Sequence, residues 1–273
     1  MIKSIFKQSF NWTKDKKDFF VLLFFTQSLY LGVFIYIFVT SFLQIMQHVN
    51  YLLDFLYSIT PEQISANLVE NPLGVYAHYN SFVNAVVILI IFSYLAYMIL
   101  NGMNWSLTNK LVNVNQKFLR FFPKFIIFTL IFTIPLIIIC YFFTRLIAVA
   151  GMQTLFLTLM MLVILVFWYF MGISFGLIER YRIKEFKHHL FKTFEVGVKK
   201  AGTLVPITLF IVVLLIFLGA MIYLTVEIFW LSVLFVVLFI LALVWTRILC
   251  MTAVREASHG HIVKVAGLIK KKK

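Results

Sequence analysis

Six apolar runs divide the chain, and their length is the strongest constraint on its fold. At a rise of about 1.5 Å per helical residue, each run is long enough to cross about 30 Å of hydrocarbon. The sequence therefore predicts an all-α, polytopic membrane helix bundle with six transmembrane helices. We expect these helices at residues 19–46, 81–106, 125–149, 154–178, 204–225 and 228–250.

The amino-acid composition supports the same class of protein. The chain of 273 residues is 63% hydrophobic and only 12% charged. Soluble domains are usually about 45–50% apolar and about 25% charged. A single core of this size cannot bury that excess, so lipid must cover part of the surface. We therefore expect residues 1–273 to form one integral membrane domain.

Two of the connections between apolar runs are very short, at residues 150–154 and 225–227. The runs on either side must be antiparallel, and the six helices are predicted to form three hairpins. A basic segment that contains Phe precedes each hairpin, which suggests three repeated units of interfacial helix plus hairpin. The alternative is that such segments precede odd-numbered spans in any protein with a cytoplasmic N-terminus.

Lysine and arginine lie almost entirely in one set of segments. Five lie in residues 1–18, four in 107–124, seven in 179–203 and six in 251–273, whereas 47–80 has none. These segments alternate along the chain as the two sides of a membrane would. By the positive-inside rule, both termini are predicted to be cytoplasmic in a multi-pass protein of the cell (plasma) membrane.

Two of the basic segments have the pattern of helices that lie in the membrane surface. In residues 1–18, Ile2, Ile5 and Phe6 recur at helical spacing, which predicts a cytoplasmic amphipathic arm. Residues 179–203 are predicted to form a cytoplasmic basic amphipathic helix. Its apolar stripe would contain Ile183, Phe186, Leu190, Phe194 and Val198, with Phe191 beside it.

The remaining peripheral segments are one exoplasmic and one cytoplasmic piece. Residues 47–80 are predicted to form an exoplasmic helical loop, in which a turn over Asn71-Pro72-Leu73-Gly74 ends a short helix. Residues 251–273 are predicted to form a basic cytoplasmic tail.

Four polar residues are predicted to lie at a similar depth near the cytoplasmic ends of the spans. They are Asn101, Asn104, Glu179 and Arg247. A charged residue inside a span is by default a functional hypothesis. Two interpretations stay open: the four residues bind a polar headgroup or ion, or they hold neighbouring helices together by hydrogen bonds while Arg247 reaches the inner headgroups.

Arg145 and Glu227 are the candidate residues near the exoplasmic ends. Arg145 is the only basic residue predicted on that side. It could pair with Glu227 or another outer carboxylate, reach outer headgroups, or bind an anionic substrate.

The expected partners are the bilayer and its anionic phospholipid headgroups. The lysines predicted to contact those headgroups are Lys184, Lys187, Lys192, Lys199 and Lys200. Gly172 and Gly176 form a GxxxG motif, which lets a second helix approach closely. That helix could belong to the same bundle or to another protomer, so a homo-oligomer is possible through these glycines.

Motifs of known enzymes are not found. We see no catalytic, cofactor-binding or metal-binding set, and we expect no cofactor and no nucleic acid. The leading hypothesis is a non-enzymatic polytopic protein, a scaffold or membrane-organising subunit with a basic cytoplasmic rim. The alternatives are a small-solute transporter or channel, and a lipid-active membrane enzyme.

Overall fold

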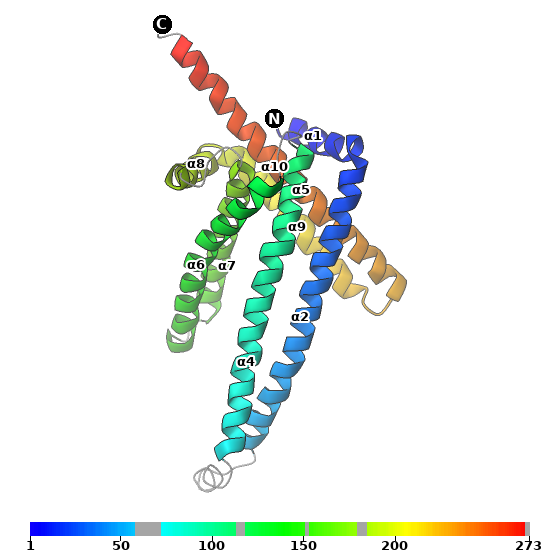
Figure 1. Ribbon diagram of the computed structural model, residues 1–273, viewed down its shortest axis with the longest axis vertical. Coiled ribbons are helices and arrows are strands. Elements are labelled where there is room, and N and C mark those ends of the chain that lie inside the picture. Colours follow the sequence, from blue (N-terminus) through cyan, green and yellow to red (C-terminus); the bar gives the residue numbers. More distant parts are fainter. Residues whose placement is uncertain (58–71, 113–117, 151–152, 179–184, 271–273) are drawn as a thin grey trace. The chain divides into compact units, whose positions relative to one another are not determined.

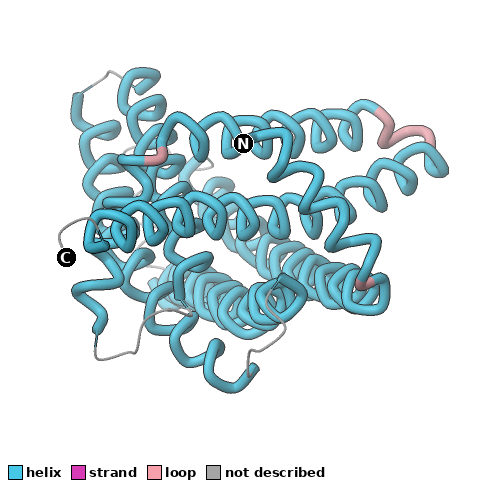
Figure 2. Tube along the Cα trace, turned by 90° about the horizontal axis from the view of Figure 1, so that it is seen from above, coloured by secondary structure: helices cyan, strands magenta, loops and turns pink. Residues whose placement is uncertain are grey.

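The computed structural model describes residues 1–57, 72–112, 118–150, 153–178 and 185–270 (Figure 1). Nearly all of these residues are helical, and short turns join some of the helices (Figure 2). The elements are α1 (Ile2–Asp15), α2 (Lys17–Tyr57), α4 (Pro72–Ala96), the π-helix η1 (Tyr97–Asn101), α5 (Gly102–Val112), α6 (Phe118–Ala150), α7 (Gln153–Leu177), α8 (Phe186–Lys199), α9 (Ala201–Leu224) and α10 (Phe229–Lys270).

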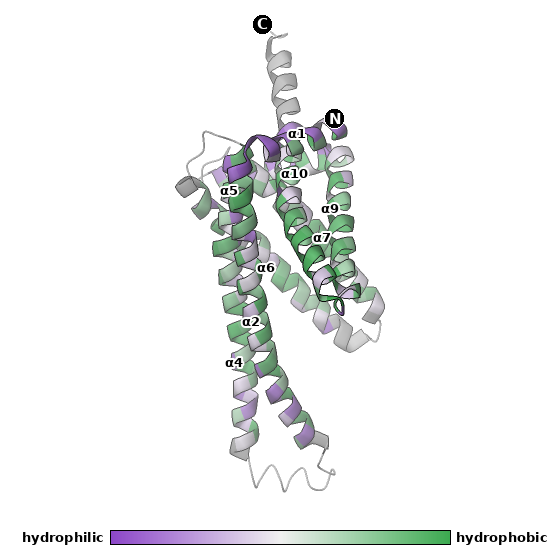
Figure 3. Cartoon of the chain, turned by 90° about the vertical axis from the view of Figure 1, so that its right-hand side faces the viewer, coloured by the Kyte–Doolittle hydropathy of each residue, from purple (hydrophilic) through white to green (hydrophobic). Residues whose placement is uncertain are grey.

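Six helices are long and apolar enough to span a membrane, as the sequence predicts. They cover Lys17–Phe55, Gly74–Val112, Phe121–Arg145, Thr154–Leu177, Ala201–Leu224 and Phe229–Ser258. Figure 3 shows hydrophobic colouring along α9 and hydrophilic colouring over α1. The protein is therefore a polytopic membrane protein. The pairing of its six spans as three hairpins stays a prediction.

The chain divides into two compact units. The first contains Met1–Gln27 and Gly102–Lys273, and the second contains Ser28–Asn101. In the second unit, helices α2 and α4 meet at His48 and His78, whose Nδ1 atoms are 3.1 Å apart. The ring of Tyr51 stacks on His78 at 3.6 Å between ring centroids.

In the first unit, α10 is the central helix and packs against α9, α7, α1 and α5. Its buried side chains are mostly small or aliphatic, and Leu249, Ala253, Val254 and Ala257 belong to the core. Large apolar residues such as Phe217 and Trp230 remain exposed. This distribution is typical of membrane helices, because lipid solvates large apolar side chains whereas close helix contact requires small ones.

Two glycines show how closely the helices of this unit approach. A Cβ atom at Gly176 would lie 2.7 Å from Cγ1 of Val254, so the absence of a side chain there lets α7 pack closely against α10. A Cβ atom at Gly197 would lie 2.5 Å from Cε1 of Phe170, which brings α8 against α7. The GxxxG motif therefore contacts a helix of the same chain, and a homo-oligomer through Gly172 and Gly176 stays a prediction.

Two peripheral segments differ from the sequence-based expectation. The predicted turn at Asn71–Gly74 is wrong from Pro72 onward, because α4 begins there. Proline is tolerated at the first helical position, where its missing N–H has no helical partner. The segment predicted as a tail from Met251 also differs: Met251–Ser258 continue α10, and small side chains of this segment, including Ala253 and Ala257, are buried in the core.

Candidate functional site

A buried polar cluster joins α2, α5 and α10 within the first unit. Gln27 is only 1% exposed, and its Oε1 atom accepts two hydrogen bonds. Asn104 Nδ2 donates one of them at 3.0 Å, and Arg247 Nη2 donates the other at 2.9 Å. One amide oxygen therefore links three helices that are distant in the sequence.

Further contacts complete this cluster around Asn104 and Arg247. Thr26 Oγ1 donates a hydrogen bond to Asn104 Oδ1. The guanidinium carbon of Arg247 lies 5.5 Å from the ring centroid of Trp105, which is within the range of a cation–π contact. Hydrogen bonds between membrane helices contribute about 0.6 kcal/mol each on average. The arrangement therefore supports the interpretation that these polar side chains hold the helices together.

Within the first unit, the structure brings together two of the residues predicted to form this site. Asn104 and Arg247 meet through Gln27, whereas Asn101 lies in η1 of the other unit and Glu179 falls outside the described residues. Gln27 was not among the residues predicted for this site. Its signal was a lone amide within the first apolar run, since an amide buried in a membrane protein needs partners on neighbouring helices.

The outer candidates do not form a pair in the described part of the chain. Arg145 Nε donates a hydrogen bond to Tyr141 Oη at 3.0 Å, and the guanidinium carbon lies 5.2 Å from that ring. Tyr141 is one helical turn away, so this partner is available without any contact between helices. Glu227 is exposed in the turn between α9 and α10.

A pocket of about 500 Å³ lies at the corner where α1 turns into α2. We call it the corner pocket, and its lining residues are Lys14, Asp15, Lys16, Lys17, Asp18, Phe19 and Lys110. Lys14, Lys17 and Lys110 are exposed, and Lys16 is half-buried. The basic character of residues 1–18 is evident from the sequence, whereas nothing in the sequence indicates that Lys110 lies beside them.

Two cations beside this pocket cap the end of α5. Lys16 Nζ donates a hydrogen bond to the carbonyl oxygen of Leu111 at 2.7 Å, and Arg255 Nη1 donates one to that of Val112 at 2.6 Å. The last carbonyls of a helix have no helical partner and carry partial negative charge. Partial burial and the nearby charge of Arg255 lower the pKa of Lys16 from its usual value. These two side chains therefore have a structural role.

Helix α8 is held against its neighbours in the first unit by a face of small and polar residues. His189, Thr193, Val196 and Gly197 are buried. His189 Nε2 lies 2.8 Å from Ser174 Oγ, and Tyr169 Oη donates a hydrogen bond to the carbonyl oxygen of Gly197 at 2.8 Å. Burial, and then the charge of Lys124, lower the pKa of His189 to about 4. This histidine is therefore neutral at pH 7.

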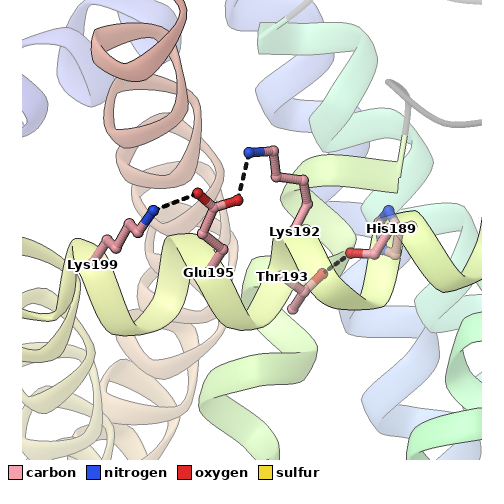
Figure 4. Close-up of polar contacts among 5 residues, drawn as sticks. All are labelled: His189, Lys192, Thr193, Glu195 and Lys199. Carbon is pink, nitrogen blue, oxygen red and sulfur yellow. Dashed lines mark hydrogen bonds and ion pairs between the residues drawn. The ribbon is translucent and has the colours of Figure 1, made fainter. Parts of the chain in front are cut away.

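The other two faces of α8 differ in character and in exposure, because Lys192 and Glu195 are half-buried whereas Lys199 is exposed. Phe191, Phe194 and Val198 form an exposed apolar face. On the next face, Glu195 forms ion pairs with both Lys192 and Lys199 (Figure 4). Hydrogen bonds from these two lysines lower the pKa of Glu195 to about 2.

The exposed charge of α8 is accordingly smaller than its lysines suggest. Among the residues predicted to contact headgroups, Lys187 and Lys200 form no ion pair within the described residues, and Lys184 lies outside them.

Comparison with known proteins gives no further assignment. No protein-family model, curated protein or solved structure matches this chain. Within the described part of the chain, no group of three or more His, Cys, Asp or Glu residues is arranged to hold a metal ion.

Proposed function

We propose that the protein is a non-enzymatic scaffold or membrane-organising subunit whose basic cytoplasmic rim binds anionic phospholipid headgroups. The observation that carries the proposal is the three-sided character of α8. One side is buried against α7, one exposes Phe191, Phe194 and Val198, and one carries lysines. A helix of this kind fits the boundary between acyl chains and headgroups, where its Phe and Val side chains contact lipid and its lysines contact phosphate.

The orientation in the proposal comes from the distribution of charge. Helix α8 follows the fourth candidate span and precedes the fifth, and the positive-inside rule supports a cytoplasmic location for it. The proposed location is the plasma membrane, with both termini cytoplasmic. The buried polar cluster around Gln27 supports a structural role for Asn104 and Arg247, since both side chains donate a hydrogen bond to Gln27 across the helix contacts.

Lipid selectivity in reconstituted vesicles tests the proposal. The full chain is placed in mixed phosphatidylcholine and phosphatidylglycerol vesicles, and spin-labelled lipids report the fraction of each that is immobilised at the protein. We expect phosphatidylglycerol to be selected over phosphatidylcholine by about fivefold at low salt, because each basic residue near an anionic surface contributes about 1 kcal/mol. The selectivity should decrease as salt increases.

The matched variants are Lys187→Gln/Lys200→Gln on α8 and Lys3→Gln/Lys7→Gln on α1. Both remove two lysines, of which Lys200 is half-buried and the other three are exposed, but only the first pair lies in the predicted headgroup-contact set. The α8 variant should lose more selectivity than the α1 variant. Equal immobilisation of the two lipids by the unmodified protein at low salt would contradict the proposal.

A further inference from the structure

The corner pocket contains lysines that the rest of the structure does not use. Lys14 and Lys17 are exposed and make no hydrogen bond or ion pair within the described residues. Lys110 contacts the ring of Phe19, with its Nζ atom 5.4 Å from the ring centroid, and its charge also faces the pocket. Lys16 differs, since its ammonium group caps Leu111. Three ammonium groups are therefore available to a ligand.

The carboxylates of the pocket limit the charge of that ligand. Asp15 and Asp18 line the pocket with the four lysines, which leaves a net charge of +2. Neither carboxylate forms an ion pair with those lysines in the structure. Two negative charges oppose the entry of a dianion such as a phosphomonoester. They also accept hydrogen bonds, so a singly charged phosphodiester with a hydroxyl-bearing headgroup matches the pocket on both counts.

The position of the pocket along the chain matches the headgroup layer. Its residues stand at the start of the first candidate span, Lys17–Phe55, and at the end of the second, Gly74–Val112. Phe19 contributes an apolar side chain directly beside the lysines. The sequence thus changes from charged to apolar within the pocket wall, as the membrane does between headgroup and acyl chain.

We propose that the corner pocket binds the phosphodiester of an anionic phospholipid such as phosphatidylglycerol, with Lys14, Lys17 and Lys110 around the phosphate oxygens. The inference deepens the proposed function and rests on it, because it assigns one defined lipid site to the basic rim. Asp15 and Asp18 face the polar headgroup and accept hydrogen bonds from its hydroxyl groups.

Native mass spectrometry of the detergent-solubilised full chain, titrated with phosphatidylglycerol, tests the assignment. The variant is Lys14→Gln/Lys17→Gln, and Lys3→Gln/Lys7→Gln is the control with the same change of charge on exposed residues of α1. Since each lysine contributes about fivefold, we expect the tightest site to weaken by at least about tenfold in the variant. The control should change by less than about twofold.

Three results would overturn the inference. The pocket variant could bind phosphatidylglycerol as tightly as the control variant does. The unmodified protein could bind phosphatidylcholine as tightly as phosphatidylglycerol. Excess inorganic phosphate could displace the lipid from the unmodified protein. The last result assigns the pocket to a free anion. If the pocket variant keeps its affinity while the unmodified protein still selects phosphatidylglycerol in vesicles, only this inference is wrong. If the unmodified protein shows no selectivity in vesicles, the proposed function is wrong as well.

Discussion

The corner pocket and α8 are both rich in lysine, but they use its charge differently. At the corner, Lys16 and Arg255 bind helix carbonyls, and the remaining lysines have no acidic partner within the described residues. On α8, a single carboxylate, Glu195, takes both Lys192 and Lys199. A count of lysines therefore does not measure the charge that a membrane or ligand encounters. What matters is whether the structure satisfies each cation with a neutral dipole or with a countercharge.

The largest effect is expected where cations cap a helix. We expect Lys16→Met/Arg255→Met to lower the free energy of unfolding by about 3 kcal/mol, because a hydrogen bond to a charged group contributes at least about 1.5 kcal/mol. Chemical denaturation in detergent measures this change in the free energy of unfolding. Lys14→Met is the control, since Lys14 makes no such bond in the described structure. If the double variant and the control have the same free energy of unfolding, the capping contacts do not stabilise the corner.

A smaller loss of folding stability is expected at acidic pH, where protonation of His189 weakens the packing of α8. His189 is buried and its pKa is lowered to about 4, whereas in the unfolded chain it is near 6.5. Between these values the unfolded chain binds a proton that the folded chain does not, so stability is complete above about pH 6.5 and decreases as pH falls toward 4. The loss at pH 5 should be about 2 kcal/mol.

Melting temperatures at pH 7.5 and pH 5 check this expectation. The same comparison in His189→Gln isolates the contribution of His189, because every other titrating group is retained. The variant should lose less stability on acidification than the unmodified protein. Identical pH dependence in both proteins would show that His189 does not couple α8 to pH.

The smallest effect concerns the charge of α8. Glu195→Gln removes the shared carboxylate and leaves Lys192 and Lys199 for headgroups, so selectivity for phosphatidylglycerol should rise by about twofold after solvent screening. Spin-labelled lipids in vesicles measure the change, and Lys3→Gln serves as a charge-change control of opposite sign. Because the pKa of Glu195 is about 2, acidification to pH 4 should not reproduce the variant. Unchanged selectivity would mean that the pairs are too weak to withhold charge.

The six spans could be predicted because hydropathy accumulates over many residues in each of them. The buried face of α8 could not be predicted in the same way. Apolar spacing selects Phe194 and Val198, yet the face against α7 contains His189, Thr193 and Gly197. In lipid, an apolar side chain gains nothing by leaving the solvent, so close packing and hydrogen bonding choose the contact.

The candidate site shows the same limit. Arg247 and Asn104 could be selected from the sequence because charge and amide groups are rare in apolar runs. Their common partner Gln27 depends on which helices meet, and no spacing within one helix contains that information. The corner pocket likewise needs Lys110 next to residues almost a hundred positions earlier in the chain.

The cap at the end of α5 also has a consequence for biosynthesis. Val112 and Arg255 are 143 residues apart, and Arg255 belongs to the last span. At about 5–20 residues per second, the ribosome needs roughly seven to thirty seconds to deliver that arginine after Val112 has been made. During this interval the carbonyl oxygen of Val112 cannot bond to Arg255, so the cap at the end of α5 is completed only after the sixth span has been made.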